Sequence, residues 1–185
     1  MSALPATEFH LLLETAEPAS LGPEVRPSRK SIAELDALLA PLFEQGNLPA
    51  SKRALIRALV FLWHDHLDES HTLAQAIANA DGSFLHGIMH RREPDYDNAK
   101  YWFHRVGQHP AFPLLGRQAA ALAATAGEKD LLAKISPEGK WDPFLFIDAC
   151  QRARRHAPAD APLLQQLQKV EFSTLLERMR LSSHV

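Results

Sequence analysis

The sequence predicts a single all-α domain of about eight helices. Apolar residues recur every three or four positions through most of the chain, which is the period of an α-helix. Polar caps, prolines and glycines separate these runs, as they do at the ends of helices. No segment shows the alternation of a half-buried strand. We therefore expect antiparallel helical hairpins, stacked either as a regular array or as an irregular bundle.

The composition is that of a globular protein. The chain has 185 residues, of which 46% are hydrophobic and 23% charged, enough for one domain with a core. The formal net charge of −2 provides no basic field, so we expect no nucleic-acid partner. The longest apolar run, from Ala58 to Trp63, is too short to span a bilayer, so we expect no membrane partner.

Cysteine usage and the first residues predict a cellular location. Cys150 is the only cysteine and cannot form an internal disulfide, which favours a reducing compartment. The first twenty residues contain early glutamates and only a three-leucine apolar core, unlike a secretory signal. We therefore expect a cytoplasmic protein.

Two regions differ in regularity. Residues 1–30 are predicted to form an irregular arm, and residues 31–185 the helical domain, because prolines interrupt the first thirty positions. A capping box from Ser31 to Glu34 predicts a helix start, Pro41 a kink or division, and Gly46 the end. The prolines of the arm are Pro5, Pro18, Pro23 and Pro27.

The following helices are marked by caps and by apolar stripes. Ser51 is the predicted cap of a helix that is apolar on two sides and therefore central. Asp95 or Asp97 should cap another, which Gly107 ends, and the pair Asp142-Pro143 should open a third. The remaining predicted helices cover residues 67–79, 83–93, 114–126 and 129–135, and a last one opens at Asp160 and Pro162.

Short segments suggest a repeat. Residues 67–71, 96–100 and 127–130 occupy equivalent positions, each between an apolar and an amphipathic helix. The run from Arg92 to Phe103, followed by His109-Pro110, resembles the second half of a tetratricopeptide or Sel1-type repeat in its turn, alanine, aromatic pair and late proline. The longer run HRREPDYDNAKYWF is similar to an uncharacterised family of bacterial and fungal proteins. These resemblances imply stacked helical hairpins and no particular activity.

The histidines give the main clue to a site, because seven of the ten lie between Trp63 and Pro110. His86, His90 and Glu93 share one helix face, as do Asp68, His71 and Gln75 on the preceding helix. If the two helices form an antiparallel hairpin, His71 lies level with His90, Gln75 with His86, and Asp68 with Glu93.

Two hypotheses follow for these residues. In the first, the protein is a binding or scaffold protein for a small-molecule or protein ligand. In the second it is a metal-dependent enzyme of the hydrolase class, with zinc, iron or manganese on His71, His86 and His90 and with Glu93 or Asp68 as a ligand or general base. A hydrogen-bonded polar layer without metal is a third interpretation. The pocket of the first hypothesis comprises His64, His71, His86, His90, Arg92, Glu93 and Lys100.

Other chemistry has little support in the sequence. Cys150 lies in an apolar helix and is expected to be buried and unreactive. No phosphate-binding loop, dinucleotide fingerprint or nucleophile elbow is present. Arg91, Arg92, Lys100 and Arg105 suggest an anion site, walled by Trp63, Tyr96, Tyr101 and Trp102, although Trp102 is expected to be in the core. Whether the protein is an enzyme is left open.

Overall fold

The computed structural model describes residues 6–126 and 129–181, which contain ten α-helices, two 3₁₀ turns and no strand. The predicted all-α class is confirmed. Among these residues, no helix combines the length and the apolar character needed to cross a bilayer. The helices are α1 (Ala6–Leu11), α2 (Ile32–Gln45), α3 (Ala50–Trp63), α4 (Leu67–Ala74), α5 (Ala80–Arg92), α6 (Tyr96–Val106), α7 (Phe112–Ala126), α8 (Lys129–Ile135), α9 (Pro143–Arg155) and α10 (Ala161–Leu181), with 3₁₀ turns at Pro137–Gly139 and Pro158–Asp160.

Side-chain caps fix several helix starts where they were predicted. Ser31 and Glu34 form both hydrogen bonds of the capping box at α2, which runs through Pro41 as one helix to its C-cap at Gly46. Asp95, rather than Asp97, caps α6 by accepting from the Asn98 backbone. The same chemistry opens α9, where the Asp142 side chain accepts two backbone N–H groups.

Three predicted boundaries are wrong. Ser51 does not cap α3, because the helix already begins at Ala50, and Pro49 precedes it without a side-chain bond. The helix expected over residues 67–79 ends at Ala74. Asn79 accepts a hydrogen bond from the Gly82 backbone, so α5 starts three residues before the predicted Ser83.

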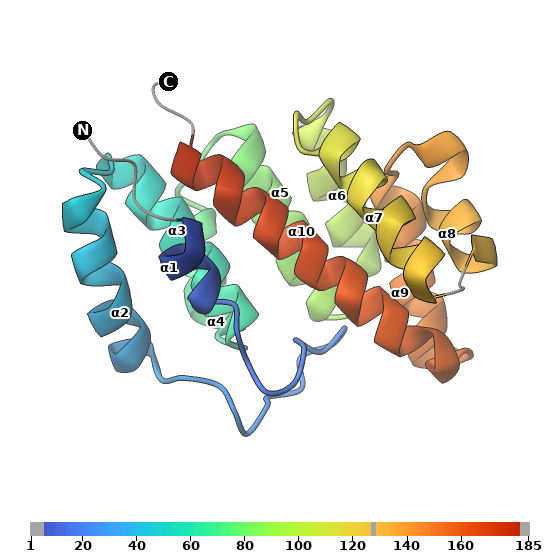
Figure 1. Cartoon of the computed structure of the whole chain (residues 1–185), viewed down its shortest axis with the longest axis horizontal. Helices are drawn as coiled ribbons and strands as arrows, with labels where there is room; N and C mark the ends of the chain where they lie inside the picture. The colour runs from blue at the N-terminus through green and yellow to red at the C-terminus, as the bar shows by residue number, and fades with distance from the viewer. Residues whose placement is uncertain (1–5, 127–128, 182–185) are drawn as a thin grey trace.

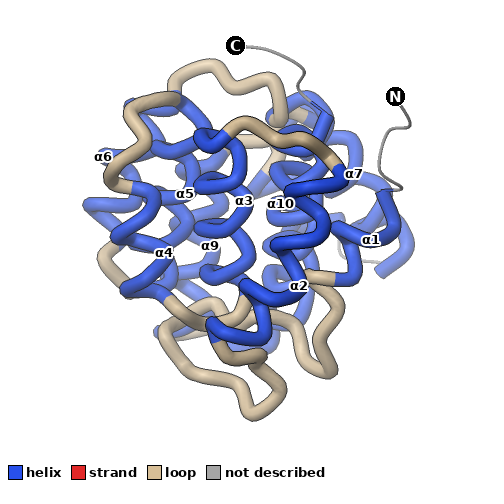
Figure 2. Tube along the Cα trace, turned by 90° about the vertical axis from the view of Figure 1, so that its left-hand side faces the viewer, coloured by secondary structure: helices blue, strands red, loops and turns tan. Residues whose placement is uncertain are grey.

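The core is built around α3 and α10. The last eight residues of α3 except Arg57 are buried, along with Leu55, which confirms the central place expected from its two apolar sides. The Trp63 ring meets Phe172 of α10 edge-on at 5.2 Å. In Figure 1, α10 runs diagonally across the front of the molecule, and it packs against α3, α7 and α9. Figure 2 shows the helices from the side, with the longer loops gathered at the two ends.

The α5–α6 hairpin is the most extensively packed pair of described helices. Its closeness depends on Gly87, because a Cβ atom there would lie 2.5 Å from the Phe103 ring. Phe84 and Phe103 then stack edge-on at 5.0 Å across the hairpin. His86 and His90 therefore lie on a closely packed pair of helices.

The N-terminal arm is not wholly irregular, because it contains α1. Phe9, Leu12, Leu13 and Leu21 are buried in the main core. Residues before and after position 30 therefore differ in how regular their secondary structure is, but both belong to the same core.

Candidate functional site

Three histidines from two helices meet in one cluster. His71 comes from α4, and His86 and His90 come from α5. The ring centroids of His71 lie 5.0 Å from those of His86 and 5.5 Å from those of His90, and His86 and His90 are 6.0 Å apart. The cluster thus arises from the helical spacing within α5 together with the register of α4 against it.

His86 is the buried centre of this cluster. Its exposed fraction is 1%, and its ring stacks on Trp102 at 4.0 Å, nearly parallel. Neither ring nitrogen makes a hydrogen bond of normal geometry. Burial, and then repulsion from any charge on His71 or His90, lowers the pKa of His86 to about 4, so the ring is neutral at pH 7. Buried polar atoms without partners are uncommon, so this ring calls for an explanation.

His90 is held by two polar neighbours. Its Nδ1 lies 3.1 Å from Glu93 Oε2, and the Asn98 amide nitrogen lies 3.1 Å from its Nε2. These contacts fit a neutral ring that donates from Nδ1 to Glu93 and accepts the Asn98 amide N–H at Nε2. Burial lowers the pKa of His90, while the Glu93 carboxylate acts in the opposite direction.

The predicted partners of the cluster are less close. Gln75 and Asp68 are exposed to solvent, and Gln75 makes no described contact with His86. Asp68 and Glu93 do line one open cavity of about 430 Å³, at the start of α4 and the end of α5. Within residues 6–126 and 129–181, no group of three or more His, Cys, Asp or Glu side chains is arranged to hold a metal ion as it stands.

Arg92 belongs to a different, structural network. It is fully buried and donates to Asp65 Oδ1 at 2.7 Å and to the carbonyl of Leu62. Arg26 binds the other Asp65 oxygen through Nε at 2.9 Å and donates to the carbonyl of Trp63. Burial alone would raise the pKa of Asp65, but the hydrogen bonds from both arginines hold it below its usual range. Together the three side chains cap the C-terminus of α3.

His64 and Lys100 also lie outside the cluster. The buried His64 ring donates from Nε2 to the Leu12 carbonyl at 2.9 Å and accepts the Lys30 backbone N–H at Nδ1. Burial lowers its pKa to about 4. Lys100 pairs with Asp148 of α9 at 2.6 Å. The single pocket expected from seven residues is therefore wrong: only His71, His86, His90 and Glu93 lie together.

The expected anion site is corrected in the same way. Arg91 is buried in an ion pair with Glu171, and the Arg105 guanidinium lies over the Trp102 ring, 5.3 Å from its centre. Trp102 is half-buried rather than part of the core. Cys150 is buried as predicted, and burial raises the pKa of its thiol to about 12.

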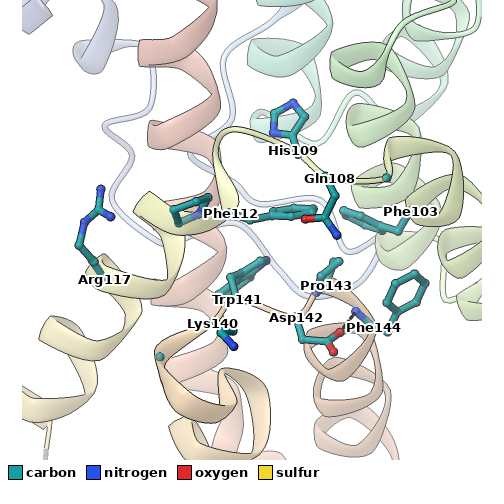
Figure 3. Close-up of a pocket in the computed structure, with 13 residues that line it drawn as sticks. Phe103, Gln108, His109, Phe112, Arg117, Lys140, Trp141, Asp142, Pro143 and Phe144 are labelled. Carbon is teal, nitrogen blue, oxygen red and sulfur yellow. Dashed lines mark hydrogen bonds between the residues drawn. The ribbon is translucent and has the colours of Figure 1, made fainter.

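A second hollow was not predicted from the sequence. A cleft of about 580 Å³ lies between the end of α6, the start of α7 and the loop before α9 (Figure 3). Its lining includes Phe103, Phe112, Trp141 and Phe144. These positions span about forty residues and share no periodic pattern, so only the aromatic density near Trp141 hinted at them.

Comparisons with known proteins add no assignment: no family model matches the chain, and neither a curated protein nor a solved structure does. The resemblances to helical repeats and to the uncharacterised family stay predictions. The function is therefore argued from the residues and their geometry.

Proposed function

We propose that the protein is a helical binding protein whose ligand is a divalent transition metal, held by His71, His86 and His90. One observation carries the proposal. Three imidazoles from two helices lie within 5.0–6.0 Å of one another, and neither ring nitrogen of the buried His86 makes a hydrogen bond of normal geometry. Zinc, iron and manganese are the metals that imidazole and carboxylate groups suit.

The spacing of the rings supports the proposal. Zinc–nitrogen bonds are about 2.0–2.1 Å long, which puts each ring centroid roughly 3 Å from the metal and two tetrahedrally placed rings about 5 Å apart. Two of the three observed distances, 5.0 and 5.5 Å, are close to this value. Two steps are still needed: the Asn98 amide must leave His90 Nε2, and the rings must turn so that one nitrogen of each points toward a common centre.

Protonation and outer contacts support it further. Histidine binds metal only as the neutral ring, and burial favours that form for His86 and His90. Metal-binding histidines commonly donate their second N–H to a carboxylate, which fixes the ring. The Glu93 carboxylate occupies that position beside His90 Nδ1.

Hydrolysis is the second candidate function. Three histidine ligands would leave a position open for water, which a metal activates as a nucleophile. Glu93 contacts His90 and also lines the cavity of about 430 Å³, where a substrate could lie, so it is the candidate general base. Asp68 lines the same cavity and is the weaker candidate because its side chain is exposed and makes no contact with the cluster.

Cobalt binding tests the metal proposal directly. We expect tag-free, chelator-treated protein to bind one Co²⁺ per chain, with visible absorption bands that excess Zn²⁺ removes. His71→Ala and His90→Ala should abolish the bands, whereas His156→Ala, at an exposed histidine beyond α9, should keep them. Circular dichroism checks that each variant is folded. Absence of stoichiometric binding, or binding that both cluster variants retain, would overturn the proposal.

The hydrolase candidate has its own test. Glu93→Gln should keep one metal per chain and lose metal-dependent cleavage of a nitrophenyl ester. If the loaded wild-type protein cleaves no faster than the metal-free protein, metal binding stands and the hydrolase candidate does not.

A further inference from the structure

We propose that the aromatic cleft binds a small planar molecule that carries a negative charge, such as an aromatic carboxylate. The cleft is separate from the histidine cluster, and its volume of about 580 Å³ lies within the range of small-molecule sites. Two separate stretches of the chain, residues 103–117 and 139–144, build it, so it exists only in the folded protein.

The walls of the cleft favour a flat ligand. Phe103, Phe112, Trp141 and Phe144 lie around it, as Figure 3 shows. Aromatic faces and edges attract another aromatic ring through offset or edge-on stacking. A saturated chain would fill the same volume without this geometry, so the walls select for planarity.

The cleft also contains polar groups that could form hydrogen bonds to a ligand. Trp141 is only 5% exposed, and its indole N–H makes no hydrogen bond. Gln108 extends its amide into the space between Phe103 and Phe112 in Figure 3. Buried donors are nearly always paired in native structures, and a ligand acceptor would pair such a donor here after a small shift of the ring.

The charges of the cleft favour an anion over a cation. Arg117 lines the cleft from α7; its exposed guanidinium points away from the aromatic walls in Figure 3 and makes no hydrogen bond or ion pair among the described residues, so it is free to turn toward an anion. Lys140, at the rim, has only a solvent-exposed contact with Glu138. The acidic lining residue, Asp142, already caps α9 by accepting two backbone N–H groups. His109 is likewise engaged, through Nε2, with Asp81.

Nuclear magnetic resonance of the full chain tests the proposal with three matched probes. Naphthoate, the neutral naphthamide and the cationic naphthylmethylamine share one ring system and differ in charge. We expect naphthoate to shift the Trp141 indole signal, assigned with Trp141→Phe, more than the indole signals of Trp63 and Trp102. It should also bind up to about fivefold more tightly than naphthamide, as one partly exposed ion pair implies.

Two variants decide the role of the rim. Arg117→Gln should remove the preference for naphthoate over naphthamide, while Arg155→Gln, at the far end of α9 from the cleft, should keep it. A folded wild-type protein whose Trp141 signal does not respond to millimolar naphthoate would overturn the cleft as a binding site. Equal binding of acid and amide, or tighter binding of the amine, would overturn the assignment of an anionic ligand.

Discussion

Replacement of Glu171 by glutamine should expose how strongly the core depends on one buried ion pair. Arg91 and Glu171 are both fully buried, and Nη2 lies 2.5 Å from Oε2. Gln168 accepts a further hydrogen bond from Arg91 at 3.2 Å, and the guanidinium lies 4.5 Å from the centre of the Phe146 ring. Glu171→Gln keeps the shape of the side chain and removes its charge.

The magnitude follows from this geometry. At an effective dielectric constant of about 20, opposite charges this close attract by roughly 7 kcal/mol, most of which offsets the cost of taking both groups out of water. Removal of one partner leaves that cost for Arg91 without the attraction. We therefore expect Glu171→Gln to lower the free energy of unfolding by about 3–5 kcal/mol. In a domain of this size the melting temperature should fall by roughly 6–20 °C.

Urea unfolding followed by circular dichroism measures the change. The double variant Arg91→Met/Glu171→Leu is the matched control, because it removes both charges and retains apolar volume. We expect it to lie within about 2 kcal/mol of the wild-type protein, or above it. A loss below about 1 kcal/mol for Glu171→Gln would refute the reasoning, since it would mean that Arg91 is solvated or re-paired at little cost.

Two further predictions concern groups whose pKa values burial displaces. His64 and His86 have pKa values of about 4 in the fold, against 6.5 when unfolded, so the unfolded chain binds more protons between these values and stability must fall as the pH drops from 6.5 toward 4. Each full pKa shift corresponds to roughly 3 kcal/mol of stability, but structural relaxation and water that enters the site reduce this value. We therefore expect the free energy of unfolding, measured by urea unfolding at a series of pH values, to fall by about 2–4 kcal/mol in total. A slope that is unchanged in the double variant His64→Gln/His86→Gln would contradict this assignment. The buried Cys150, with its pKa raised to about 12, should resist iodoacetamide at pH 8 in the folded protein and react once urea unfolds it. Equal alkylation rates with and without urea would show that the thiol is accessible.

The sequence predicted helix starts well where a side chain supplies the cap. Ser31 with Glu34, and Asp142 before Pro143, satisfy backbone donors within a few residues, so the signal is local. The start of α5 was missed because Asn79 and Ser83 are both good caps, and sequence alone does not rank them. Asn79 is the cap in the structure.

Only the part of the site that follows from helical periodicity could be predicted from the sequence. The spacing of His86 and His90, with the register of the hairpin, anticipated the approach of His71. Periodicity says which residues share a face but not what opposes that face. Arg92 follows His90 by only two positions, yet it turns into the core, where its partner is Asp65. The aromatic cleft was missed because tertiary contacts alone bring its walls together.

The arginine cap on α3 has a consequence for how the chain reaches its final state. Asp65 adopts a left-handed backbone conformation, with φ of 64°, and is bonded to residues 39 positions before it and 27 positions after it. Neither α3 nor its neighbours can complete this corner locally, because loops on both sides must close first. The Asp65 corner is complete only when both the N-terminal arm and α5 have docked on α3. We therefore expect it to form late in folding, after the folding nucleus.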